Sequence, residues 1–161
     1  MAEEKNAVQQ AKTVYGTLCK MLTDTGLKFK SFDEDLTVTF GFKGEDIPVE
    51  IIANIDPERL LITMFSQLPF TVPENKRADV ALAISMVNCS IVDGSFGFDY
   101  NKGTVVFKIT SRFNESLIGK SLLEYMMVIC YRTVERFNDK FFLIANGKMS
   151  LEELQQFIRE E

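Results

Sequence analysis

The chain has 161 residues, of which 46% are hydrophobic and 25% are charged, a composition typical of globular proteins and unlike that of disordered ones. We expect a single domain over residues 1–161, long enough to bury a core without disulfides or metals. The net charge of −5, with no run of lysine or arginine, argues against nucleic-acid binding, because phosphates would repel such a chain.

The pattern of residues 3–24 predicts a helix. Apolar side chains recur every three or four positions and form one stripe, whereas most charged and amide side chains fall elsewhere. The stripe consists of Ala7, Ala11, Val14, Tyr15, Leu18, Met21 and Leu22. Gly26 is expected to end the helix, because glycine readily adopts the left-handed conformation common at helix ends.

Residues 27–66 change to a period of two, which predicts a meander of three or four antiparallel strands. Turns are expected at residues 33–34, 43–46 and 55–58, where Asp, Glu, Gly and Pro gather. The inward apolar set is Leu36, Val38, Phe40, Phe42, Ile47, Val49, Ile51, Leu60, Ile62 and Met64.

A second helix is predicted from Thr71 to about Asn88. Thr71 is the expected N-cap, since Glu74 follows three residues later and proline is tolerated in a first turn. The face expected to be buried consists of Ala78, Leu82, Ser85, Met86 and Cys89.

Residues 94–110 predict a hairpin with its turn at residues 101–103. One strand places Phe96, Phe98 and Tyr100 opposite Val105, Phe107 and Ile109 of the other.

Residues 116–142 predict the longest helix. Only Glu124 is charged between Leu122 and Tyr131, so we expect this helix to be buried nearly all round. The sequence Ser-Leu-Glu-Glu at residues 150–153 is a capping box for a short C-terminal helix. The fold class is therefore α+β: one antiparallel sheet of about five to six strands, with helices packed on one face.

The recognisable machinery of catalysis is missing from this sequence. The absence of histidine excludes Ser-His-Asp and Cys-His nucleophiles and histidine zinc sites. The glycine-containing segment 94–99 leads along a strand and lacks the Lys-Ser/Thr pair of a phosphate loop. The carboxylates at residues 33–35 and 45–46 fall at predicted turns without calcium-loop spacing. We expect no catalytic residue, no cofactor and no metal, and hence no enzyme.

Three cysteines, Cys19, Cys89 and Cys130, are widely spaced and form no CxxC pair. We interpret them as buried or half-buried thiols of a reducing compartment. The N-terminus lacks the basic and apolar regions of a signal peptide, and no apolar run approaches the roughly 20 residues that span a bilayer. A cytoplasmic protein that does not bind membranes is expected.

Arg132, Arg136 and Lys140 recur every four residues and share a helix face. They form either a dock for an acidic partner or the solvated face of the last helical turns, and we favour the second interpretation.

Some apolar strand residues have the phase opposite to the inward set. In a one-sided sheet these positions should be polar. The residues concerned are Ile52, Leu61, Phe65 and Val106. Something therefore covers part of the second sheet face: a segment of the same chain, a second subunit, or a bound polypeptide. These four residues are the predicted partner-binding residues.

The second half of the chain resembles the YbjN-like family, bacterial proteins regarded as candidate sensory transduction regulators. The resemblance rests on Ser-Met-Val-Asn at residues 85–88, Gly-Ser-Phe-Gly-Phe-Asp at 94–99 and Gly-Thr-Val-Val-Phe-Lys at 103–108. Lys108 departs from the arginine of the family pattern. By motif the resemblance covers about residues 70–135, and by element order the whole chain. It implies the fold of type III secretion chaperones, commonly homodimers that hold an extended or partly unfolded polypeptide, and it implies no catalytic residues.

Composition, strand pattern and resemblance together predict a non-enzymatic, chaperone-like or regulatory protein that engages a polypeptide as a homodimer. The alternative is a small-molecule sensor with a phenylalanine-lined apolar pocket between sheet and helices.

Overall fold

The structure, a computed structural model, describes residues 2–114 and 116–160. These residues form six strands, one short 3₁₀ helix and four α-helices. In chain order the elements are α1 (Ala2–Asp24), β1 (Phe29–Phe32), β2 (Thr37–Phe42), β3 (Val49–Asp56), β4 (Leu61–Gln67), the 3₁₀ helix Glu74–Lys76, α2 (Arg77–Asn88), β5 (Ser95–Asp99), β6 (Thr104–Arg112), α3 (Lys120–Ala145) and α4 (Leu151–Arg159).

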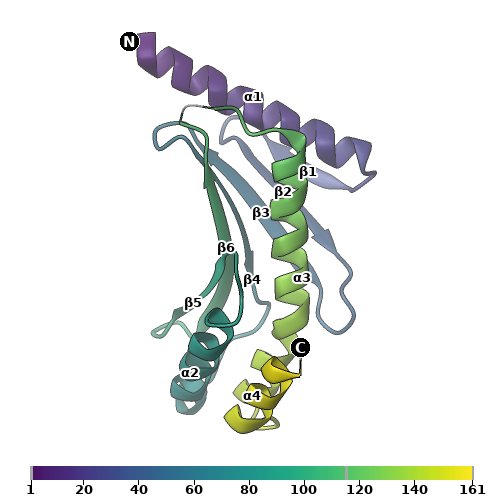
Figure 1. The fold of residues 1–161 in the computed structure, drawn as a ribbon, viewed down its shortest axis with the longest axis vertical. Helices are drawn as coiled ribbons and strands as arrows, with labels where there is room; N and C mark the ends of the chain where they lie inside the picture. The colour runs from purple at the N-terminus through teal and green to yellow at the C-terminus, as the bar shows by residue number, and fades with distance from the viewer. Residues whose placement is uncertain (1, 115, 161) are drawn as a thin grey trace.

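All six strands belong to one antiparallel sheet with the order β1-β2-β3-β4-β6-β5. The four N-terminal strands form the predicted meander, and the C-terminal hairpin joins it through β6. The long helix α3 runs along one face of this sheet, and α1 crosses one end of it (Figure 1). The predicted α+β class, with helices on one sheet face, is confirmed.

The core lies between that sheet face and the helices. Most of the predicted inward set is buried; in β3, for example, Val49 and Ile51 are at most 1% exposed. Phe42, Ile47 and Leu60 are only half-buried, because they lie at a strand end or outside the strands. Ile55, predicted to lie in a turn, is instead buried in β3. The predicted stripe of α1 from Ala11 to Leu22 is buried against this core. Gly26 ends α1 in the left-handed conformation, with the Leu27 N–H donating to the Leu22 carbonyl oxygen.

The predicted start of the second helix is wrong. Thr71 is not its N-cap, because the helical backbone begins only at Glu74 and α2 only at Arg77. The residues before Glu74 instead pack against the turn of the β5–β6 hairpin, where the Val72 N–H donates to the Gly103 carbonyl oxygen at 2.8 Å. A tertiary hydrogen bond thus replaces the local cap.

The predicted buried face of α2 is also wrong. Ala78, Leu82, Ser85 and Cys89 are exposed, with Leu82 at 56%, and Met86 is half-buried. The buried residues are Val80, Ala83, Ile84 and Val87. The helix carries two apolar rows, and the row with more branched aliphatic side chains is the one that removes more apolar area from water.

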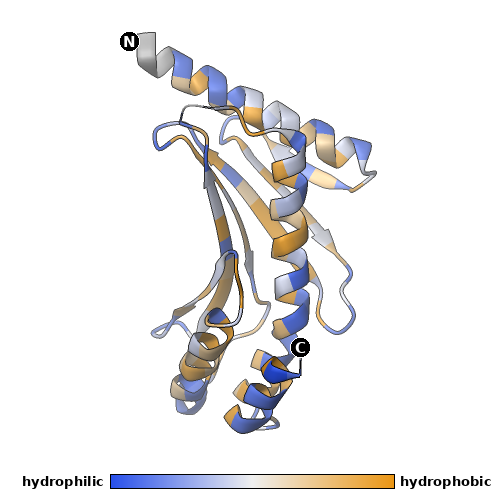
Figure 2. Cartoon of the chain, in the orientation of Figure 1, coloured by the Kyte–Doolittle hydropathy of each residue, from blue (hydrophilic) through white to orange (hydrophobic). Residues whose placement is uncertain are grey.

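Helix α3 begins at Lys120 rather than residue 116 and is not buried all round. Leu122 (39%), Tyr125 (45%) and Val128 (37%) are exposed along one side, at intervals of three residues. Figure 2 shows hydrophobic and hydrophilic segments alternating along this helix. Because α3 lies on a single sheet face, the side turned away from the sheet remains accessible.

The two remaining predictions of local structure agree with the fold. Phe96 pairs with Phe107 and Phe98 with Val105 in the β5–β6 hairpin, although Tyr100 lies in the turn and is exposed. The Ser150 hydroxyl accepts a hydrogen bond from the Glu153 N–H, and the Glu153 carboxylate accepts one from the Ser150 N–H, so the capping box of α4 is present.

Candidate functional site

The second face of the sheet is the main candidate surface. The helices cover the face that carries the core, while the side chains on the opposite phase are half-buried or exposed. All four predicted partner-binding residues, Ile52, Leu61, Phe65 and Val106, lie on this second face and are half-buried. In the described residues no helix of the same chain packs over them, so we call this surface the open face.

Three of the four residues form one cluster. Phe65 of β4 lies directly opposite Ile52 of β3 in the sheet register. Val106 of β6 is the diagonal neighbour of Phe65, because Phe65 pairs with Lys108 and Gln67 with Val106. Side chains in such positions are within reach of one another. We call Ile52, Phe65 and Val106 the apolar patch.

Leu61 stands apart from the apolar patch. It pairs with Asp56 and Arg112 near the other end of the strands, four residues from Phe65 along β4. Sequence phase places a residue on a face but does not say which neighbours share its row.

The rest of the open face is mainly polar. Between the patch and Leu61, Thr63 and Thr110 share a hydrogen bond at 3.1 Å, and the Asn54 amide donates to the Thr37 hydroxyl at 2.8 Å. These side chains suit a hydrated sheet surface. The apolar patch is therefore a local feature with a polar surround.

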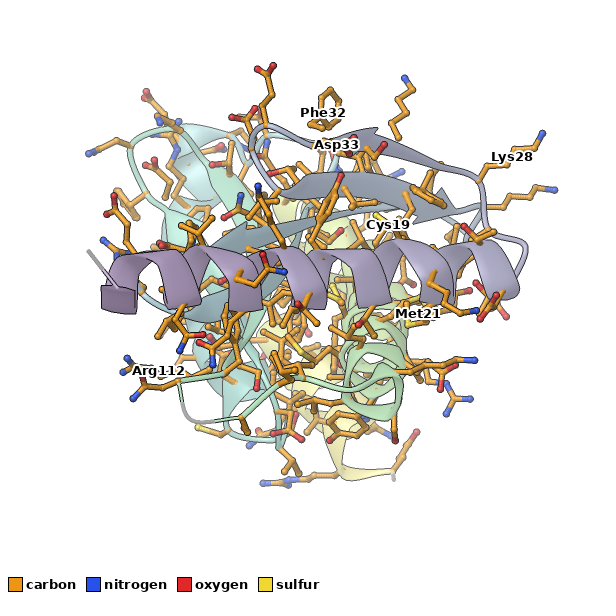
Figure 3. All side chains as sticks on the ribbon, turned by 90° about the horizontal axis from the view of Figure 1, so that it is seen from above. Cys19, Met21, Lys28, Phe32, Asp33 and Arg112 are labelled. Carbon is orange, nitrogen blue, oxygen red and sulfur yellow. The ribbon has the colours of Figure 1, made fainter. Side chains whose placement is uncertain are left out.

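Phe32 is an apolar residue of the open face that the sequence interpretation missed. It pairs with Thr37, is 48% exposed and points away from α1 (Figure 3). Residues 29–32 are too few for their alternation alone to show which side chains face the core. The pairing of Phe29 with the buried Phe40 places Phe29 on the core side, and Phe32, three residues later, therefore lies on the open face.

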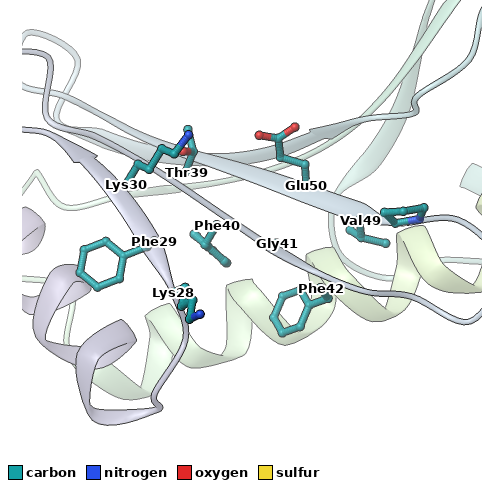
Figure 4. Close-up of a pocket in the computed structure, with 10 residues that line it drawn as sticks. Lys28, Phe29, Lys30, Thr39, Phe40, Gly41, Phe42, Val49 and Glu50 are labelled. Carbon is teal, nitrogen blue, oxygen red and sulfur yellow. The ribbon is translucent and has the colours of Figure 1, made fainter.

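One outer edge of the sheet has a hollow. Strand β1 stops pairing at Phe29 opposite Phe40, so β2 continues past it through Gly41 and Phe42. A groove of about 470 Å³ lies beside this unpaired end of β2. Phe29 and Lys28 line one side of it and Phe42 the other, with Phe40 between them (Figure 4). The groove thus combines phenylalanine rings with a strand edge of β2 that β1 leaves unpaired.

The opposite outer edge is closed by a side chain. The Asn88 amide at the end of α2 donates to the Phe96 carbonyl oxygen at 2.9 Å and accepts from the Phe96 N–H at 2.8 Å. The amide thereby occupies the backbone groups that a further strand would use. This explains why an asparagine ends the helix in the motif at residues 85–88.

The phenylalanines between sheet and helices pack on one another. The Phe96 ring centroid lies 5.1 Å from that of Phe107, 5.0 Å from that of Phe141 and 6.2 Å from that of Phe137. These edge-to-face contacts pack phenylalanine side chains of the sheet and of α3 on one another, and the alternative hypothesis of a phenylalanine-lined pocket stays a prediction.

The basic side chains of α3 are neither a free dock nor a simply solvated face. The Arg136 guanidinium lies 4.7 Å from the Phe137 ring centroid and 5.6 Å from that of Phe157, and the Lys140 ammonium lies 4.7 Å from that of Phe157. Lys140 also pairs with Asp139, whereas Arg132 is exposed. Arg136 and Lys140 therefore hold α4 against α3 through Phe157.

The thiols differ in exposure. Cys130 is buried and Cys19 half-buried, as expected, but Cys89 is exposed, because the face of α2 that carries it points outward. Burial raises the pKa of the Cys130 thiol to about 12 and also raises the pKa of Cys19. Raised pKa values keep these two thiols protonated and poorly nucleophilic at neutral pH.

In the first acidic turn, Asp33 serves local structure. Asp33 accepts a hydrogen bond from the Tyr15 hydroxyl at 2.5 Å, and burial followed by this bond raises the pKa of Tyr15 above its ordinary value. In the described part of the chain no three His, Cys, Asp or Glu side chains gather within reach of one metal ion. No helix among residues 2–114 and 116–160 has the length and hydrophobicity to cross a bilayer.

Comparison with known proteins identifies the fold. No family model matches the chain, and no curated protein sequence matches it. The crystal structure of YbjN from E. coli, a candidate transcription regulator, resembles it with a TM-score of 0.59 at 14% identity, over 82% of this chain and 90% of YbjN. A chain of the ExsC–ExsE complex resembles it with a TM-score of 0.60 at 18% identity, over 80% of this chain and 93% of that one. The predicted YbjN-like, type III secretion chaperone-like fold is thus confirmed.

Proposed function

We propose that this protein is a non-enzymatic, chaperone-like or regulatory protein of the cytoplasm that binds a polypeptide partner as a homodimer. The observation that carries the proposal is the apolar patch on a sheet face that no described helix covers. An extended or partly unfolded polypeptide is the expected occupant, since it can lay apolar side chains on the patch and its backbone along a sheet edge.

The size of the patch suits reversible binding. Fully burying a side chain such as Ile, Phe or Val contributes about 1.5–3 kcal/mol, and those of the patch are already half-buried. The patch therefore supplies only part of an affinity, and strand-edge hydrogen bonds supply more. Two copies of the patch in a homodimer raise the affinity for one long client through their effective concentration.

The exposed face of α2 supports the homodimer. Ala78, Leu82 and Cys89 form an outward row of small and apolar side chains on this helix. A second copy of the chain that packs on this row buries Leu82, which the fold of one chain leaves in water. The open face then remains available for the client.

The patch is tested by replacing its central residue. We expect Phe65→Ser to weaken binding of a reduced and alkylated, permanently unfolded test protein by about tenfold, because the patch loses its largest apolar side chain. Fluorescence anisotropy of the labelled test protein measures the affinity.

Thr63→Ser is the matched control, since Thr63 lies on the same strand and face outside the patch. It should leave the affinity unchanged, and circular dichroism should show both variants folded. Equal affinities of the native protein and folded Phe65→Ser would rule out the patch as the binding surface.

A further inference from the structure

The second strand overhang of the sheet lies at β6. Strand β5 pairs with β6 only from Asp99–Thr104 to Ser95–Lys108, whereas β6 continues to Arg112. Figure 1 shows β5 beside only the lower part of β6. On that side, residues 109–112 of β6 have no strand partner within the described chain.

We call the space beside residues 109–112 of β6, where β5 no longer pairs, the gap. The hydrogen-bonding pattern of the sheet identifies which backbone groups of β6 point into it. The Phe113 N–H donates to the Leu60 carbonyl oxygen, and the Val105 carbonyl oxygen accepts from the Leu68 N–H, so odd-numbered residues of β6 bond toward β4. Even-numbered residues therefore bond toward β5, and beyond Lys108 the N–H and C=O groups of Thr110 and Arg112 face the gap. An added strand satisfies these groups.

Apolar side chains of α3 line the same gap. A groove of about 400 Å³ lies between residues 108–111 of β6 and Leu122, Tyr125 and Met126 of α3. Leu122 and Tyr125 belong to the exposed side of α3. The Tyr125 hydroxyl donates to the Asp93 carboxylate, which closes one end of the groove.

The charged side chains of β6 beside the groove are basic. Lys108, Thr110 and Arg112 are exposed on the open-face side of β6, and Arg112 projects outward at the periphery (Figure 3). Within the described chain neither Lys108 nor Arg112 has a carboxylate partner. The carboxylate that lines the groove, Asp93, is engaged by Tyr125.

We propose that the gap between β6 and α3 binds an extended segment of a partner polypeptide in which apolar and acidic residues alternate. This inference rests on the proposed polypeptide-binding function and names the place and the sequence class of one bound segment. The backbone of the segment pairs with Thr110 and Arg112. Side chains of an added strand alternate between the two faces, so apolar ones contact Leu122 and Tyr125 and acidic ones lie beside Lys108 and Arg112.

The geometry excludes the same arrangement at the neighbouring strand. Asn88 occupies the outward backbone groups of Phe96 in β5, so an added strand there has to displace the amide. The bound segment is consequently about four residues long, the length of β6 that β5 leaves unpaired.

The test uses a fluorescein-labelled eight-residue peptide that alternates valine and glutamate, with anisotropy as the readout. Its controls are a peptide of four valines followed by four glutamates, and one that alternates valine and lysine. We expect the alternating valine–glutamate peptide to bind saturably and the two controls to bind at least tenfold more weakly.

Two edge variants locate the binding. Thr110→Pro removes the N–H that faces the gap, and we expect it to weaken the peptide about three- to tenfold, the range for one lost hydrogen bond. Ser31→Pro removes an outward N–H from β1 at the opposite edge and should leave the affinity unchanged. Circular dichroism establishes that each variant folds.

Arg112→Glu is a second test that does not alter the backbone. It should turn the preference from the valine–glutamate peptide toward the valine–lysine peptide. The proposal is overturned if the native protein does not bind the alternating peptide, if the block peptide binds equally well, or if Ser31→Pro weakens binding as much as Thr110→Pro. If the peptide fails while the unfolded test protein still binds through Phe65, the groove proposal alone is wrong; if both fail, the proposed function is wrong as well.

Discussion

At the scale of single residues, close backbone approaches decide where glycine is required. Gly94 enters β5 with a φ of 75°, and a Cβ added there would lie 2.4 Å from the Phe107 ring and 2.9 Å from the Lys108 carbonyl oxygen. Gly16, in the middle of α1, has nothing within 4 Å of the same position. The two glycines therefore have opposite effects on stability.

We expect Gly94→Ala to lower the free energy of unfolding by about 1–3 kcal/mol, because alanine is strained at this φ and meets a backbone carbonyl. Gly16→Ala should raise it by about 0.5–1 kcal/mol, since alanine is the better helix former. Urea denaturation followed by circular dichroism measures both. A destabilised Gly16→Ala, or an unaffected Gly94→Ala, would contradict the packing described for these positions.

At the scale of elements, α4 depends on a local cap and on a distant aromatic contact. The Ser150 and Glu153 pair closes its first turn, and Phe157 lies beside Arg136, Lys140 and Phe137 of α3. Hydrogen bonds from Ser150 hold the pKa of the Glu153 carboxyl below its ordinary value. The hydrogen bond from the Ser150 N–H to the Glu153 carboxylate therefore contributes at neutral pH and weakens when Glu153 is protonated, whereas the bond from the Glu153 N–H to the Ser150 hydroxyl remains.

Ser150→Ala should lower the free energy of unfolding by about 1 kcal/mol at pH 7, the usual cost of an N-cap. Folding lowers the pKa of the Glu153 carboxyl. The stability that its ionised form contributes is therefore fully present at pH values above the pKa of the unfolded chain, and it is lost as the pH falls through the pKa of the folded chain. The stability lost on Glu153→Ala should therefore shrink in acid, whereas the stability lost on Ser150→Ala should persist, because alanine keeps the backbone N–H that the carboxylate binds. Amide hydrogen exchange of α4 at neutral and acidic pH measures the effect, with Ser121→Ala on the exposed side of α3 as the control. A cap that gains strength in acid would refute this assignment.

Elements whose pattern is local were predictable from the sequence, and those set by distant partners were not. The α1 stripe, the alternation in β2 to β4 and the capping box at Ser150 each depend on neighbours within a few residues. The start of α2 depends on Val72 binding Gly103, and its buried face on a choice between two apolar rows that its own sequence leaves open.

The candidate surface was predictable in the same limited way. The phase of Ile52, Phe65 and Val106 places them on the open face, yet only the strand order brings them together and separates Leu61 from them. The overhang of β6 and the closure of β5 by Asn88 depend on register and on a side-chain contact between elements. No periodicity in the sequence encodes either.

At the scale of the whole molecule, the fold is an antiparallel sheet whose one face is covered by helices. The other face keeps a small apolar patch, each sheet edge has a strand overhang, and α2 and α3 each carry an exposed apolar side. These are the surfaces that the proposed homodimer and the proposed extended partner would use.

Multi-angle light scattering of the purified protein, alone and mixed with the unfolded test protein at several concentrations, determines whether the protein is a homodimer that binds a polypeptide. We expect a stable mass near twice 18.3 kDa for the protein alone, and a further increase equal to the mass of the bound test protein in the mixture. A mass of 18.3 kDa at every concentration, unchanged by the unfolded protein, would contradict the proposal of a polypeptide-binding homodimer.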